Sequence, residues 1–131
     1  MLEFKIKTNA REEIIDITHE IQSTLHKMEW GRGCLLVYCP HTTAALTINE
    51  TEDTTAIEDM KHFLSKLIPR SPDFTHRGGN SDAHIKSSLL GQSLMLLVEH
   101  GTIQIGAWQG LYLYEGDGPR ERDIWLQFIP S

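Results

Sequence analysis

Two segments of the chain place histidines among hydroxyl, amide and carboxylate side chains where a purely structural segment would carry apolar residues. The first is the stretch CPHTTAALTINE at residues 39–50, in which an apolar run separates His41, Thr42 and Thr43 from Glu50. Burying such groups beside a strand has a desolvation cost unless each of them finds a partner. We therefore interpret this stretch as one wall of a functional site.

The length of this stretch limits which of its polar groups can meet. An extended strand from His41 to Glu50 spans about 30 Å, at about 3.3 Å per residue. The imidazole and the carboxylate can therefore approach each other only through a bend or across a subunit interface. The alternative is a surface histidine, with Glu50 and Asp53 serving the N-terminus of the helix that follows.

The second segment holds His76, Asn80 and His84 in and after a loop rich in glycine, serine and proline. Two histidines on such a loop can converge on one metal ion, and His41 would complete a set of three ligands. Catalytic zinc commonly takes three protein ligands and a water molecule. The alternative for each histidine is that it is simply solvated.

Three further groups could bind a phosphorylated ligand. Lys86 offers an ammonium beside the hydroxyls of Ser87 and Ser88, which suits a phosphate oxygen. Arg120 and Arg122 would lie on the same side of an extended segment and could clamp phosphate or carboxylate, or could instead pair with Glu115, Asp117 or Glu121. The ordinary alternative for residues 86–88 is a helix start or a surface turn.

Gln109 is the polar exception in an apolar strand next to Trp108. Trp108 itself is more typical of core or interface packing than of a stacking platform.

The elements that position these residues follow from hydrophobic periodicity. The spacing of Ile17, Ile21, Leu25 and Met28 predicts a helix that starts near Thr18 and ends by Gly31 or Gly33. A second helix is expected over residues 52–67, and residues 69–83 form one long irregular segment. Strands are expected at residues 2–7, 14–17, 35–38, 43–48, 94–98, 102–105, 107–114 and 122–129. We expect one α+β domain over residues 1–131, with mixed or antiparallel sheets and two main helices.

Composition excludes several classes of protein. Eighteen acidic against twelve basic residues leave a formal charge of −6, which argues against non-specific nucleic-acid binding. The N-terminal residues lack the apolar core of a signal peptide, and no run approaches the ~18 apolar residues of a membrane span. The two cysteines form no CxxC pair, so a thiolate zinc site is not indicated. We expect a cytoplasmic protein that binds no membrane.

Taken together and in order, four motifs resemble the YjbQ-type family, also described as the secondary thiamine-phosphate synthase family. They are HTTAALTINE, then H-x-x-x-N-x-x-A-H-I-K-S-S-L-L-G, then G-x-W-Q-G, then D-G-P-R-x-R. The resemblance extends from about Phe4 to Phe128. It implies a compact α+β fold that assembles as a homotrimer, with the polar motif residues in a pocket near the subunit interface.

The resemblance also implies an activity and a distribution of roles. The activity joins a hydroxymethylpyrimidine diphosphate to a thiazole phosphate, as a main or a side reaction of a transferase. It needs a divalent metal ion, zinc or magnesium, and no organic cofactor. The implied catalytic residues are His41, Glu50, Asp53 and His84. The implied substrate or phosphate ligands are Thr42, Thr43, Asn80, Lys86, Ser88, Gln109 and Arg120. The implied metal ligands are His41, His76 and His84.

Two other classes of function remain open on the sequence. One is a metal-dependent hydrolase or lyase with an unrelated substrate, using a histidine-bound water. The other is a non-catalytic trimer that binds a ligand or a metal.

Overall fold

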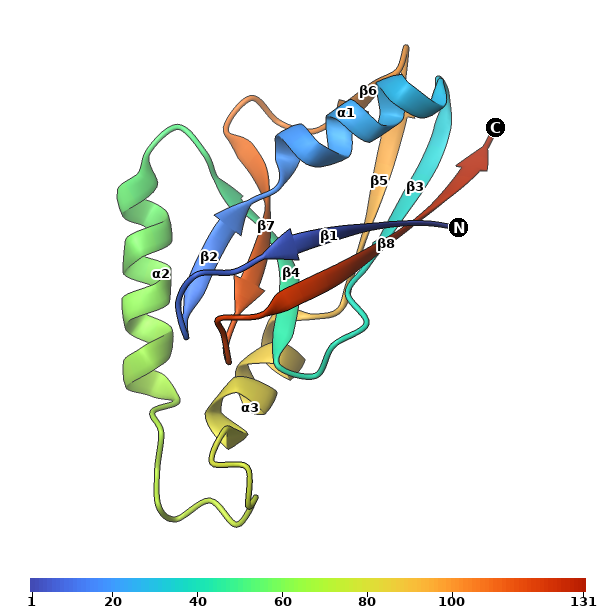
Figure 1. The fold of residues 1–131 in the computed structure, drawn as a ribbon. Helices are drawn as coiled ribbons and strands as arrows, with labels where there is room; N and C mark the ends of the chain where they lie inside the picture. Colours follow the sequence, from blue (N-terminus) through green and yellow to red (C-terminus); the bar gives the residue numbers. More distant parts are fainter.

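Two antiparallel sheets and three helices make up the computed structural model, which describes residues 1–131 (Figure 1). The larger sheet has five strands in the order β1-β8-β3-β5-β6, and the smaller has three in the order β2-β7-β4. The strands are β1 (Leu2–Lys7), β2 (Glu13–Asp16), β3 (Gly33–Tyr38), β4 (Ala44–Glu50), β5 (Ser93–Glu99), β6 (Thr102–Gln104), β7 (Gln109–Glu115) and β8 (Glu121–Pro130). The helices are α1 (Thr18–Met28), α2 (Thr54–Leu67) and α3 (Ser81–Leu90). The predicted α+β class with antiparallel sheets is confirmed.

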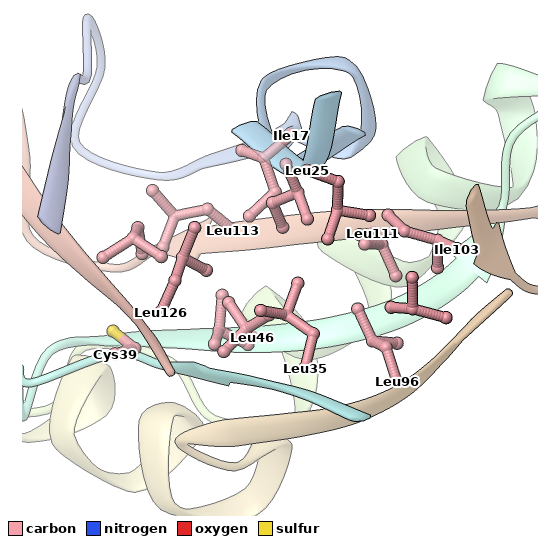
Figure 2. Close-up of a cluster of buried hydrophobic side chains, with 14 of the residues drawn as sticks. Ile17, Leu25, Leu35, Cys39, Leu46, Leu96, Ile103, Leu111, Leu113 and Leu126 are labelled. Atoms are coloured by element: carbon pink, nitrogen blue, oxygen red, sulfur yellow. The ribbon is translucent and has the colours of Figure 1, made fainter. Parts of the chain in front are cut away.

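The hydrophobic core lies between the inner faces of the two sheets (Figure 2). Leu35, Leu96 and Leu126 reach it from the larger sheet, and Leu46 and Leu113 reach it from the smaller one. Helix α1 adds one apolar face to the same core: its buried residues are Ile21 and Leu25, and Ile17 is buried just before it. The predicted helical period at these positions is therefore confirmed.

Helices α2 and α3 lie against the smaller sheet, with contacts to β4 (Figure 1). The Asp53 carboxylate caps α2 by accepting a hydrogen bond from the backbone N–H of Thr55 at 3.0 Å. Leu64 is buried on this helix, whereas Leu67, its last residue, is 58% exposed. No helix of the chain is both long enough and apolar enough to cross a membrane.

Helix α3 lies where the sequence predicted the end of an irregular segment and no main helix. Its buried residues are Asp82, Ala83, Lys86 and Ser87, and these are mostly polar. A helix that buries ionic and hydroxyl groups shows no apolar stripe, so hydrophobic periodicity does not detect it. The chain consequently has three helices instead of the two that were expected.

The outer face of the larger sheet is not covered by any helix. The strand register places Leu36, Tyr38 and Met95 on this face, together with Leu97 and Ile129. Four of these side chains, those of Tyr38, Met95, Leu97 and Ile129, are exposed. We refer to these five residues as the outer apolar face.

Candidate functional site

A cavity of about 570 Å³ opens between the β3–β4 connection, helix α3 and the middle of β8. Its lining residues are Tyr38, Cys39, Pro40, His41, Thr42, His84, Ser87, Ser88, Gln92 and Trp125. Four of the residues predicted for the site, His41, Thr42, His84 and Ser88, are therefore brought to one cavity. We call it the histidine cavity.

Hydrogen bonds fix the two walls of the histidine cavity to each other. The Ser87 hydroxyl on α3 donates to the backbone carbonyl of Ala44 at 2.6 Å. The backbone N–H of Cys39 donates to the carbonyl of Gln92 at 2.8 Å. These bonds join the segment before β4 to α3, and they explain how His41 and His84 come together.

His41 is held in one protonation form. The backbone N–H of Asp123 donates to His41 Nε2 at 2.8 Å. Burial lowers the pKa of His41, and the Arg122 cation lowers it further. With Nε2 as the acceptor, the neutral ring carries its proton on Nδ1. His41 is thus built to donate a hydrogen bond from Nδ1, while its Nε2 lone pair is already engaged.

An aromatic pair forms another wall of the cavity. Tyr38 and Trp125 stack with their ring centroids 5.8 Å apart and an interplanar angle of 26°. The Trp125 indole N–H donates to the Glu3 carboxylate at 2.8 Å, which fixes the orientation of the ring. The sequence analysis missed both aromatics. The only available signal was the position of Tyr38 directly before the CPHTT segment.

Cys39 also lines the cavity but is not suited to act as a nucleophile. Burial raises the pKa of its thiol to about 11. The reactive form of cysteine is the thiolate, which is scarce at neutral pH in a thiol of this kind.

His76, in the loop before α3, contacts His84 on that helix. Their ring centroids are 5.0 Å apart in an edge-to-face arrangement. Both line a second cavity, of about 310 Å³, between α3 and the preceding loop. No three His, Cys, Asp or Glu side chains of the chain converge in a way that could hold a metal ion. His84 is therefore shared by two cavities, with His41 on one side and His76 on the other.

Asn80 precedes α3 and is fixed by the β7–β8 turn. Its Nδ2 donates to Asp117 Oδ2 at 2.8 Å. The same carboxylate oxygen accepts from Arg120 Nη2 at 3.1 Å, so Arg120, predicted to bind phosphate, is in an ion pair. Asn80 Oδ1 is buried and has no hydrogen-bond partner.

Lys86, which was predicted to bind phosphate, is instead on the buried face of α3. Its side chain is 1% exposed, and Nζ donates to Glu12 Oε1 at 2.7 Å. Arg11 makes two hydrogen bonds of 3.1 Å to the Asp82 carboxylate next to it. The Asp82 pKa is lowered, because the hydrogen bond and charge of Arg11 outweigh the opposing effect of burial. This cluster fixes the helix that carries His84 and Ser88.

Thr43 points to a second buried ion pair and not to the histidine cavity. Arg122 binds the Glu115 carboxylate, and its Nη2 also donates to Thr43 Oγ1 at 2.8 Å. The Glu115 carboxylate accepts a further hydrogen bond from the Thr8 hydroxyl at 2.8 Å. No lysine or arginine lines the histidine cavity.

The remaining predicted residues, Glu50, Asp53 and Gln109, lie at the opposite end of the smaller sheet. Strand β4 pairs with β7 from Ala44 at the cavity end to Glu50, which pairs with Gln109. Gln109 Oε1 accepts from the backbone N–H of Gly106 at 2.7 Å, a contact within its own loop. As the strand length indicated, one chain does not bring these groups to His41.

Comparison with known proteins finds relatives that match nearly the whole chain in sequence. The family described as "UPF0047 protein YjbQ-like" matches residues 2–131. A UPF0047 protein of Methanocaldococcus jannaschii is 46% identical over 98% of this chain and 94% of its own. The UPF0047 protein YugU of Bacillus subtilis is 41% identical over 95% of this chain and 96% of its own.

Solved structures agree with these sequence matches. A crystal structure of a YjbQ/UPF0047 family protein from Clostridium acetobutylicum superposes with a TM-score of 0.94 at 40% identity. It covers 98% of this chain and 100% of its own. A conserved hypothetical protein from Thermus thermophilus has a TM-score of 0.92 at 36% identity, with coverages of 98% and 100%. The chain therefore belongs to the YjbQ/UPF0047 family.

Proposed function

We propose that the chain is a small-metabolite transferase of the secondary thiamine-phosphate synthase type, with the histidine cavity as its active site. The observation that carries the proposal is the assembly of His41, Thr42, His84 and Ser88 beside the stacked Tyr38–Trp125 pair. Residues more than 40 positions apart in the chain thus supply donors and a flat apolar wall to one cavity.

The reaction needs the groups that this cavity offers. The thiazole nitrogen attacks the CH₂ group of the pyrimidine, a C–N bond forms, and the C–O bond to the diphosphate breaks. Pyrophosphate leaves with the bonding electrons, and no proton has to be removed from the attacking nitrogen. Hydrogen-bond donors at the leaving group lower the barrier, because charge develops there in the transition state. His41 Nδ1–H and the hydroxyls of Thr42 and Ser88 fit this role, and the His84 imidazole in the same cavity can act as a general acid on the leaving pyrophosphate. A pyrimidine can stack on Trp125.

A second requirement is positive charge for the phosphorylated substrate. The histidine cavity contains no lysine or arginine of its own chain. A divalent cation or groups from a neighbouring subunit would have to supply this charge. We therefore include both a metal ion and a homotrimer in the proposal.

The outer apolar face supports assembly into a homotrimer. It exposes Tyr38, Met95, Leu97 and Ile129 side by side, and Tyr38 also lines the histidine cavity. Contiguous apolar surface of this kind is typical of subunit interfaces. A neighbouring chain packed here would stand at the cavity, where it could contribute further residues.

We expect Leu97→Asp to dissociate the assembly, because an aspartate placed in an apolar interface loses its hydration without a partner. Light scattering should give three times the mass of one chain for the native protein and a lower mass for the variant. Phe63→Asp is the matched control, since Phe63 is 62% exposed on α2 and lies away from this face. A native protein that runs as a monomer would contradict the trimer.

The function is tested by measuring thiamine-phosphate formation from the two phosphorylated precursors, with and without Zn²⁺ or Mg²⁺. We expect His84→Ala to lower kcat/KM by at least about 100-fold, the usual range for loss of a positioned catalytic group. Trp125→Leu should mainly raise KM, because it removes a stacking surface. His62→Ala, an exposed histidine on α2, is the control and should leave the rate unchanged.

Full activity in His84→Ala would overturn the proposed site. Tight binding of the pyrimidine diphosphate without any product would favour a non-catalytic binding protein instead. The second candidate function is a metal-dependent hydrolase or lyase, favoured by the contact between His76 and His84 at the edge of the cavity. Metal-dependent turnover of generic phosphate esters, without thiamine phosphate, would favour this candidate.

A further inference from the structure

We propose that Glu3, on the N-terminal strand β1, is a positioning residue for the histidine cavity. It holds the Trp125 ring in the one orientation on which a planar ligand stacks. Glu3 does not line the cavity itself, so it acts only through Trp125. The strand β1 carries none of the polar motifs, yet it belongs to the binding machinery. The inference rests on the proposed function only where it names the ligand as a pyrimidine.

The contact between Glu3 and Trp125 is a cross-strand pair. In the antiparallel pairing of β1 with β8, Glu3 lies directly opposite Trp125, so both side chains are on the same face of the larger sheet. Trp125 Nε1–H donates to Glu3 Oε2 at 2.8 Å, which is a hydrogen bond to a charged acceptor. Because the indole has one polar atom and that atom only donates, the bond determines which edge of the ring faces β1.

The carboxylate that accepts this bond is itself held in place. Lys5 Nζ lies 3.4 Å from Glu3 Oε1, the oxygen that Trp125 does not use, and 2.5 Å from Asp123 Oδ1. The backbone N–H of Asp123 in turn donates to His41 Nε2 at 2.8 Å. Two rungs of the β1–β8 pairing therefore support the Trp125 ring and the backbone group that holds His41.

Packing alone restricts the Trp125 ring only in part. Trp125 is half-buried, and Tyr38, on which it stacks, is 41% exposed. Without the bond to Glu3, the indole can populate other side-chain rotamers. A ligand that needs one of these rotamers then binds more weakly, in proportion to the population that remains in it.

The alternative role for the Glu3–Trp125 bond is to fasten β1, an edge strand, to the rest of the larger sheet. Other contacts already do this: the backbone of β1 pairs with β8 from Leu2 to Lys7, and Leu2, Phe4 and Ile6 pack against the core. The two roles predict different results. Loss of a fastening contact lowers stability, whereas loss of a positioning contact changes the ring and the affinity for its ligand.

The first measurement is the indole Nε1–H resonance of Trp125 in the ¹⁵N-labelled full-length protein without ligand. Trp125→Leu assigns this resonance, since the chain also contains Trp30 and Trp108. We expect Glu3→Ala to shift the resonance and to speed its exchange with water, because the N–H group loses its acceptor. Glu3→Gln should restore much of both, because an amide oxygen also accepts.

The second measurement is the pair kcat and KM for the hydroxymethylpyrimidine diphosphate in the thiamine-phosphate assay. Glu3→Ala should raise KM about 5-fold, the factor that one ordinary hydrogen bond represents, and leave kcat within about 2-fold. Glu3→Gln should have a KM near the native value. A rescue of this kind is not expected if the carboxylate acts only through its charge.

Glu99→Ala is the matched control. Glu99 is also a partly exposed carboxylate of the larger sheet, with 45% of its side chain exposed against 42% for Glu3, and it pairs with Arg32. It lies on β5, which β3 separates from β8. The Trp125 resonance and the KM should both stay native in this variant. Denaturant unfolding of each variant, monitored by circular dichroism, measures stability separately.

Three results would overturn the inference: a Trp125 resonance that does not move in Glu3→Ala, a native KM in that variant, or the same changes in Glu99→Ala. A Glu3→Ala protein whose only change is lower stability would establish the fastening role instead. Failure of the enzymatic proposal gives a different pattern. No protein, native or variant, would then form thiamine phosphate, and the resonance alone would decide whether Glu3 fixes the ring.

Discussion

Arg122→Met is expected to lower the free energy of unfolding by about 3–5 kcal/mol, the usual cost of leaving one member of a buried ion pair alone. Arg122 is 2% exposed, and its partner Glu115 is fully buried. The methionine keeps much of the packing volume but leaves the carboxylate without its cation. Denaturant unfolding monitored by circular dichroism measures the change.

The control is the double variant Arg122→Met with Glu115→Gln. Removing both charges should restore part of the lost stability, because the unpaired carboxylate is the main source of the cost. A loss below about 1 kcal/mol in Arg122→Met alone would show that the pair is hydrated in solution and not buried.

The pH dependence gives an independent check on the same pair. Burial would raise the Glu115 pKa, but hydrogen bonds from Arg122, Asp117 and Thr8 outweigh it, and the pKa is lowered below its ordinary 4.5. The stabilisation is therefore present above pH 4.5 and is lost as the pH falls through the folded-state pKa. In Arg122→Met, burial still raises the Glu115 pKa, but the Arg122 hydrogen bonds that lower it are lost. The stability difference between the two proteins should therefore shrink on acidification.

Lys86→Met is expected to cost about 3 kcal/mol, the low end for a buried ion pair, because Glu12 keeps some exposure and Asp82 keeps Arg11. It should also reduce activity, since the Lys86–Glu12 contact fixes the helix that carries His84. Equilibrium unfolding and kcat/KM on the same preparation separate the two effects.

Arg120→Met is the comparison for Lys86→Met. Arg120 is half exposed and pairs only with Asp117, so its loss should change stability by less than about 1 kcal/mol. If Lys86→Met left stability unchanged but abolished binding of the phosphorylated substrate, Lys86 would be a phosphate ligand after all. The buried ion cluster would then not describe the protein in solution.

Local sequence patterns were enough to predict the elements whose burial follows a simple period. Ile17, Ile21 and Leu25 indicated α1, and all three are fully buried. The apolar run that contains Leu35 and Val37 indicated a central strand, and β3 is the middle strand of the larger sheet. Helix α3 escaped prediction because its buried face is made of Asp82, Lys86 and Ser87, whose partners lie elsewhere in the chain.

The candidate site was likewise only partly predictable from the sequence. His41, Thr42, His84 and Ser88 were identifiable by residue type, because polar and titratable side chains beside apolar runs need partners. Trp125 and Tyr38 were not, because an aromatic residue in a strand is equally typical of the core. Their place in the cavity depends on the pairing of β3 with β8, which joins residues far apart in the chain.

By itself, the sequence determined the antiparallel α+β class and the family, and it predicted a histidine-containing site. It also determined that His41 and Glu50 cannot meet on one straight strand, because strand rise is a local property. Only the tertiary structure decided which basic side chains are free to bind a ligand. Lys86 and Arg122 resemble ligands in the sequence, but burial gives each a carboxylate partner, Glu12 and Glu115. The physical reason is that ion pairing and desolvation depend on distances between residues that are remote in the chain, and no local pattern encodes those distances.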